Sequence, residues 1–144
     1  MSTFTLVSLL GGAHVLGARP KSARQWHRVI SQGVPVRAAE RLKDSMEVSD
    51  SVLAALLGIS EKTLSRAKKA NASLDAVASD RLFRVARIAA LARKSLESGK
   101  AALAWLKRPQ AGLGGQTPVS LLTTSAGAEE VERLLLRIEY GVYS

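Results

Sequence analysis

The sequence has no cysteine and only two histidines, His14 and His27, in 144 residues. It can therefore form no disulfide, thiolate zinc site, iron–sulfur cluster or cysteine nucleophile. Neither histidine has a carboxylate partner at a catalytic spacing, and the glycine-rich Gly112–Gly115 lacks the Lys-Ser/Thr ending of a phosphate-binding loop. We expect no catalytic residue, no metal ion and no cofactor. The lack of cysteine also fits a cytoplasmic protein.

Acidic residues are scarce, because 12 Asp and Glu stand against 21 Lys and Arg, for a formal charge of +9. Residues 1–72 carry 11 basic and 5 acidic groups (net +6), whereas residues 73–144 carry 10 and 7 (net +3). This balance favours a polyanionic partner, nucleic acid first, bound mainly by the first half. No apolar stretch reaches the roughly 20 residues that cross a bilayer, so no membrane span is expected. Residues 1–16 could form a helix broken at Gly11-Gly12 or a loosely ordered arm.

Helical periodicity in the first half predicts a helix-turn-helix at about residues 49–70. Apolar residues recur at helical spacing as far as Leu57, and Gly58 can adopt the positive φ found just past a helix end. Ser60 is a favoured N-cap for a second helix that reaches about Ala70. The segment Val36–Met46, which follows a proline, is expected to form the supporting helix. Helix, short turn and helix together are typical of a unit that reads DNA.

Polar residues of the second helix are the candidate DNA contacts. We expect Ala55, Ile59 and Leu64 to pack the two helices together, which would leave an outer face of Lys62, Thr63, Ser65, Arg66 and Lys69. Arg and Lys can bind guanine or phosphate, and Thr and Ser can contact phosphate oxygen or a thymine methyl group. The alternative is an ordinary helical hairpin whose basic face is solvated. One reading helix per chain also predicts a dimer, because such proteins bind paired half-sites.

The second half is predicted to be helical as well. Asp80 is expected to cap a long helix from about Arg81 to Leu96, and a shorter helix, Lys100–Lys107, is expected to bury Trp105. A further helix is predicted to begin at Thr117-Pro118, and the last to run from near Ser125 to Gly141. Two of the six aromatic residues, Tyr140 and Tyr143, lie within the final five positions. A tyrosine beside a terminal carboxylate can enter a partner's pocket.

Several segments resemble the MbcA/ParS/Xre antitoxin family. They are Leu57–Ser60, Ser79–Leu82, Trp105–Pro109, Leu113–Pro118, Leu121-Leu122 and Arg137–Ser144. The resemblance that these segments carry extends over nearly the whole chain. Two positions depart from the family pattern. Gln110 stands where Asn commonly follows the proline, and Ala67-Lys68 stand where the reading helix is often richer in Arg.

The resemblance implies an all-α protein with an Xre-like helix-turn-helix region packed with a small C-terminal toxin-binding domain. The expected divisions are an N-terminal region, 1–75, a connecting helix, 76–98, and a toxin-binding domain, 99–144. It also implies two partners, a RES-domain toxin that degrades NAD+ and the operator DNA of the operon. The antitoxin is further expected to form a homodimer through the C-terminal domain and a higher-order complex with the toxin. Such a protein would lie at the nucleoid when it is bound to its operator.

The resemblance carries the toxin-blocking role onto the end of this chain. The residues concerned are Arg137, Tyr140, Gly141, Val142, Tyr143 and Ser144. The family's C-terminal end lies at the entrance of the toxin's active site, so these residues are expected to occlude it, while the helix-turn-helix represses the shared operon. The alternative is a plain transcriptional repressor whose second half only dimerises. That alternative explains the basic charge but not the aromatic tail.

Overall fold

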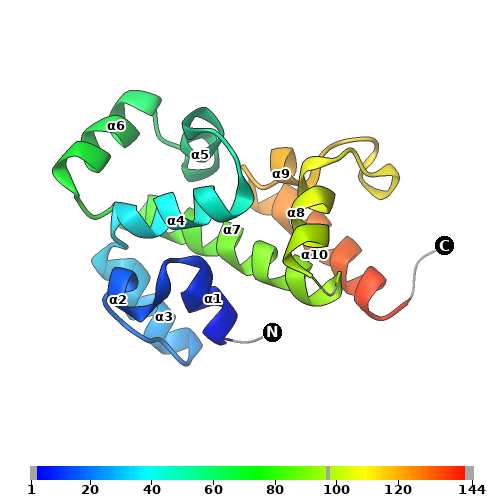
Figure 1. Ribbon diagram of the computed structural model, residues 1–144, viewed down its shortest axis with the longest axis horizontal. Helices are drawn as coiled ribbons and strands as arrows, with labels where there is room; N and C mark the ends of the chain where they lie inside the picture. Colours follow the sequence, from blue (N-terminus) through cyan, green and yellow to red (C-terminus); the bar gives the residue numbers. More distant parts are fainter. Residues whose placement is uncertain (1–2, 97, 142–144) are drawn as a thin grey trace. The chain divides into compact units, whose positions relative to one another are not determined.

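The computed structural model describes residues 3–96 and 98–141. Within them the chain forms ten α-helices, one short 3-10 helix and no β-strand, so the all-α prediction is confirmed (Figure 1). The residues divide into two compact units, one that ends at Ala86 and one that begins at Arg87. No helix in the described stretches is both long enough and apolar enough to span a membrane.

The first unit begins with two short helices that pack on a longer one. Helices α1 (Thr3–Leu9) and α2 (Gly12–Leu16) both contact α4 (Val36–Met46). They are separated at Gly11 and Gly12, whose φ angles are 95° and 83°. Residues 3–16 therefore form a helix broken at the two glycines, and not a loose arm.

Between these elements lies a helix that the sequence did not single out. Helix α3 (Ala23–Gln32) begins at Ser22, whose hydroxyl accepts a hydrogen bond from the Gln25 amide. Its buried Trp26 packs against Phe83 at a ring-centroid distance of 5.0 Å. Burial of one aromatic side chain is enough to fix which face of this otherwise polar helix turns inward.

Helix α4 is the centre of the first unit. In Figure 1 it lies between α1–α3 and the pair formed by α5 (Asp50–Leu57) and α6 (Glu61–Ala70). It contacts both α5 and α6, and its Val36, Ala39 and Leu42 are almost completely buried. The predicted supporting helix is confirmed with the expected bounds.

The helix α7 (Ala76–Ser95) begins earlier than the sequence suggested. Asp75 caps it, because its Oδ1 accepts a hydrogen bond from the Ala78 amide at 2.8 Å, whereas Asp80 is exposed inside the helix. The prediction that Asp80 is the cap is wrong. Inside the helix, the buried Ser79 Oγ accepts the Val34 amide at 2.8 Å, which ties the start of α7 to the segment before α4.

The second unit contains the last part of α7 and four further helices: α8 (Gly99–Lys107), η1 (Ala111–Leu113), α9 (Pro118–Leu121) and α10 (Ser125–Glu139). Helix α9 contacts α8 and α10, and η1 contacts α10. Trp105 and Leu135 are buried in this unit, as the apolar pattern predicts. The predicted helix start at Thr117-Pro118 is also confirmed, because Thr117 Oγ1 accepts the Ser120 amide and the proline occupies the first turn.

Candidate functional site

The turn between α5 and α6 has the predicted geometry. Gly58 adopts φ 70° and ends α5, and the Ser60 Oγ caps α6 by accepting the Thr63 amide at 3.0 Å. The Ser60 hydroxyl also donates to Thr63 Oγ1 at 2.9 Å. This hydrogen bond holds the Thr63 side chain in place. Thr63 accepts in it, so the Thr63 hydroxyl proton can still be donated to a ligand.

The Arg81 side chain lies close to Gly58 at this turn. A Cβ atom on Gly58 would lie 2.2 Å from Arg81 Nη1, and the same Nη1 donates a hydrogen bond to the Leu57 carbonyl at 3.4 Å. The guanidinium is the far end of a flexible side chain and could move away, with loss of its hydrogen bond to Leu57. The positive φ is therefore what requires glycine at this turn.

The structure brings the five candidate DNA contacts to one exposed surface of α6, which we call the α6 face: Lys62, Thr63, Ser65, Arg66 and Lys69. Leu64, on the opposite side, is the buried residue of this helix. The expectation that Ala55 packs the two helices together is wrong, because Ala55 is exposed, whereas its neighbours Leu56 and Leu57 are buried. The register of so short a helix is ambiguous by one residue when only its apolar pattern is considered.

Ion pairs hold α6 against its neighbours. Lys68 Nζ lies 2.9 Å from Asp50 Oδ2 and 3.9 Å from Glu40 Oε1, which links α6 to α5 and α4. Lys43 adds a contact of 3.5 Å to the same Asp50 carboxylate. The hydrogen bond from Lys68 lowers the pKa of Asp50, and the same bond raises the pKa of Lys68. Lys68 is thus a structural residue, whereas its neighbour Lys69 is exposed.

The end of α10 carries the described part of the candidate toxin-binding residues. Arg137 is exposed, and Tyr140 is 71% exposed at the end of the helix. Gly141 has φ 69°, and a Cβ atom built on it would meet no neighbour within 4 Å. We call Arg137, Tyr140 and Gly141 the α10 end. The other candidate residues, Val142, Tyr143 and Ser144, lie outside the described residues.

Two ion pairs connect the last part of α7 with α10. Arg87 donates two hydrogen bonds to the Glu132 carboxylate, at 2.6 and 3.1 Å, and this interaction lowers the pKa of Glu132. Lys94 Nζ lies 3.3 Å from Glu139 Oε1. Because Glu139 directly precedes Tyr140, the second pair fixes the helix just before the α10 end. Sequence reasoning did not find these pairs, because their partners lie 45 residues apart.

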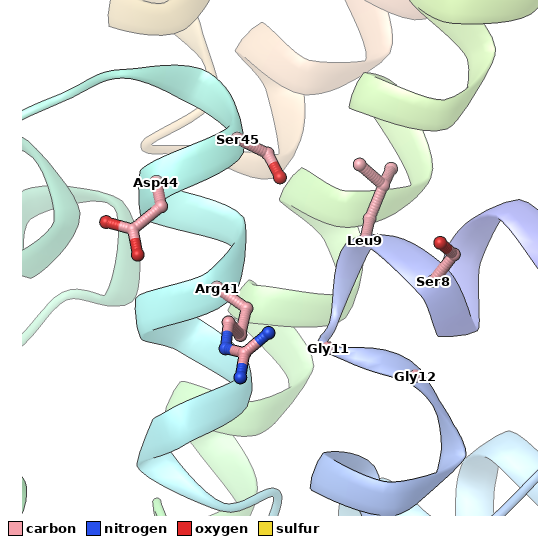
Figure 2. Close-up of a pocket in the computed structure, with 7 residues that line it drawn as sticks. All are labelled: Ser8, Leu9, Gly11, Gly12, Arg41, Asp44 and Ser45. Carbon is pink, nitrogen blue, oxygen red and sulfur yellow. The ribbon is translucent and has the colours of Figure 1, made fainter.

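An open hollow of about 570 Å³ lies between the α1–α2 turn and α4. Figure 2 shows the residues that line it, which are Ser8, Leu9, Gly11, Gly12, Arg41, Asp44 and Ser45. A Cβ atom on Gly11 would come within 3.0 Å of Arg41 Cγ, so the glycine lets α4 approach the turn. Within the described residues, no three His, Asp or Glu side chains gather as metal ligands.

Two protein families match successive parts of the chain. The Antitoxin Xre-like helix-turn-helix domain matches residues 25–87, and the Antitoxin Xre/MbcA/ParS C-terminal toxin-binding domain matches residues 91–141. A DNA-binding helix-turn-helix joined to a toxin-binding domain defines an antitoxin, a regulatory protein without enzymatic activity. The chain belongs to the Xre/MbcA/ParS family of antitoxins.

Individual relatives agree with this assignment. The chain is 29% identical over 130 residues to Antitoxin Xre of Photorhabdus laumondii, covering 90% of this chain and 88% of that protein. It is 26% identical over 125 residues to a Prs ADP-ribosylating antitoxin of Sphingobium, covering 81% and 79%. The fold matches a chain of the M. tuberculosis MbcT–MbcA toxin–antitoxin complex with a TM-score of 0.54 and 17% identity, covering 76% of this chain and 94% of that chain.

Proposed function

We propose that this antitoxin blocks the active site of a RES-domain toxin that consumes NAD+, and that it represses its own operon through α6. The observation that carries the toxin-blocking role is the exposed α10 end. Tyr140 presents an aromatic ring to solvent, and Arg137 lies one turn before it. Tyr and Arg are the residue types that most often dominate the binding energy of protein interfaces.

The proposed blocking mechanism is steric and needs no reaction by the antitoxin. Val142, Tyr143 and Ser144 would enter the pocket that otherwise holds NAD+, and the Tyr143 ring would fill space that the nucleotide needs. Arg137 and Tyr140, held in place by the Lys94–Glu139 pair, would contact the rim of that pocket. The toxin could then not bind NAD+ and the end of the antitoxin chain at the same time.

Repression would use the α6 face. Arg66 and Lys69 would bind guanine edges or phosphates, and Thr63, already held by Ser60, would donate its hydroxyl proton to a phosphate oxygen. Paired half-sites would require a dimer, which we assign to the C-terminal domain. Residues 1–75 would then bind DNA, residues 76–98 would connect, and residues 99–144 would bind the toxin and a second antitoxin.

The name of one relative favours a second possible reaction for the toxin partner, namely ADP-ribosylation of a protein. The name of the Sphingobium protein associates it with ADP-ribosylation of Prs. A toxin that ADP-ribosylates a protein also consumes NAD+, so the same tail could block either enzyme. The two cases differ in their products, since one releases free ADP-ribose or a derivative and the other modifies a protein.

The test uses the purified toxin and its NAD+ consumption. Wild-type antitoxin is titrated against the toxin, followed by Arg137→Ala/Tyr140→Ala. As a matched control on the same helix we use Arg133→Gln, since Arg133 is exposed and its ion pair among the described residues is with the exposed Glu129. We expect the double variant to need at least tenfold more protein for half-inhibition, because interface anchors of this kind carry most of the binding energy. Equal inhibition by the double variant and the control would refute the role of the α10 end.

A further inference from the structure

The hollow beside α4 lies wholly within the first unit. Its walls are the turn between α1 and α2 and one side of α4, and its volume of about 570 Å³ falls within the range of small-molecule sites. The matched helix-turn-helix domain begins at residue 25, after α1 and α2, so neither matched family assigns a role to this hollow. A ligand site here would be built from different residues than the α6 face and the α10 end.

Glycine forms the wall of the hollow on the side of α1 and α2. Gly11 and Gly12 have positive φ angles, and a Cβ atom on Gly12 would meet no atom within 4 Å. Backbone without side chains therefore forms this part of the wall and leaves the hollow open. Figure 2 shows Arg41 reaching from α4 toward the glycine turn, with Asp44 and Ser45 one turn further along α4.

The polar side chains that line the hollow are not used by the fold. Among the residues that the structure describes, the side chains of Arg41, Ser8 and Ser45 form no hydrogen bond and no ion pair. The Asp44 carboxylate has a contact of 3.8 Å with Lys43, its neighbour in the sequence. The other side of α4 differs, because its charged residues join the ion pairs that hold α6. The groups at the hollow are therefore available to a ligand.

These groups together suit a ligand that carries both an anion and hydroxyl groups. The Arg41 guanidinium can bind a phosphate through two parallel hydrogen bonds, and the serine hydroxyls can donate to the same phosphate. The Asp44 carboxylate only accepts, so it requires a donor from the ligand. Leu9 is the one apolar side chain among the 7 that line the hollow, and none of the 7 is aromatic. The site thus offers no ring on which a nucleobase could stack.

The spacing of the two charged groups favours a sugar phosphate over an amino acid. Arg41 and Asp44 are three residues apart on α4, a rise of about 4.5 Å along the helix axis. An amino acid carries its carboxylate and its ammonium group on a single carbon atom. In a sugar phosphate, several atoms separate the phosphate from the far hydroxyl group. We propose that the hollow binds a small sugar phosphate, with its phosphate on Arg41 and a hydroxyl group on Asp44.

The test is isothermal titration calorimetry of the full chain with ribose 5-phosphate, ribose and inorganic phosphate. We expect ribose 5-phosphate to bind more tightly than either partial ligand. Arg41→Gln keeps the side-chain carbon beside Gly11 but should weaken ribose 5-phosphate by about tenfold or more, because charged hydrogen bonds are lost. The matched control is Arg37→Gln, which removes the same charge one turn earlier on α4, at a residue that does not line the hollow. The control should leave the affinity nearly unchanged.

Asp44→Asn tests the second contact separately. It should weaken ribose 5-phosphate, because a ligand hydroxyl loses its charged acceptor, and strengthen inorganic phosphate, because a repelling carboxylate is removed. All three variants change exposed side chains, so the circular dichroism spectrum should not change.

Three results would overturn the proposal. One is an equal loss of affinity in Arg41→Gln and Arg37→Gln, since net charge alone would then explain the binding. Another is binding of ribose 5-phosphate that is no tighter than that of inorganic phosphate or of serine. The third is binding only to vesicles that contain phosphatidylglycerol, which present phosphate and hydroxyl groups on a lipid surface.

Discussion

Gly127, in the first turn of α10, has no room for a side chain. A Cβ atom built on it would lie 2.0 Å from the Leu121 carbonyl oxygen, closer than the 3.0 Å below which real contacts essentially never occur. The α9 and α10 backbones would have to separate by about 1 Å. Overpacking typically costs 1–3 kcal/mol, and a backbone contact belongs near 3 kcal/mol. The higher helix propensity of alanine offsets up to about 1 kcal/mol of this cost, so Gly127→Ala should lower the free energy of unfolding by about 2 kcal/mol.

The matched control is Gly112→Ala. Its new methyl group would meet the Leu134 Cδ1 atom at 3.1 Å, and that side chain can rotate away. We expect thermal unfolding followed by circular dichroism to show a fall in Tm of roughly 5–10 °C for Gly127→Ala and a much smaller change for the control. Toxin affinity should fall with Gly127→Ala, while DNA affinity should not. Unchanged stability of Gly127→Ala would refute the reasoning.

Two further outcomes follow from single side chains. Because Arg87 holds the pKa of Glu132 below its usual 4.5, the pair stabilises the fold above about pH 4.5 and loses this contribution as the pH falls through the lower, folded-state pKa. Between pH 5 and pH 2, the free energy of unfolding measured in urea should therefore fall less for Glu132→Gln than for the wild type. The same pH dependence in both proteins would contradict the pairing. Ser60→Ala should cost about 1 kcal/mol, since the α6 cap is lost. DNA titration should show weaker binding at unchanged toxin affinity, and an unaltered urea midpoint would argue against the cap.

Features that depend on neighbouring residues could be predicted from the sequence. Gly58 and Ser60 define the α5–α6 turn through a positive φ and a side-chain cap, both of which are local. The proline after Thr117 likewise marks the start of α9. The exposed α6 face followed from the same short-range pattern, because its five residues lie opposite Leu64.

Features that depend on distant residues could not be predicted. Asp75 and Asp80 are equally good caps by residue type, and the structure uses Asp75, while Ser79 between them bonds to the distant Val34 amide. The pairing of Lys68 with Asp50 joins residues 18 positions apart, so nothing near Lys68 distinguishes it from Lys69. Tertiary contacts settle such choices, and local propensity does not contain them.

The most direct test of the toxin-blocking role is cellular NAD+ after the toxin is induced. The toxin is expressed alone, with the full antitoxin, and with an antitoxin that lacks Gly141–Ser144, and the truncated protein is checked for an unchanged circular dichroism spectrum. We expect NAD+ to collapse with the toxin alone, to be preserved by the full antitoxin, and to collapse again with the truncated one. Full protection by the folded, truncated protein would contradict occlusion by the tail.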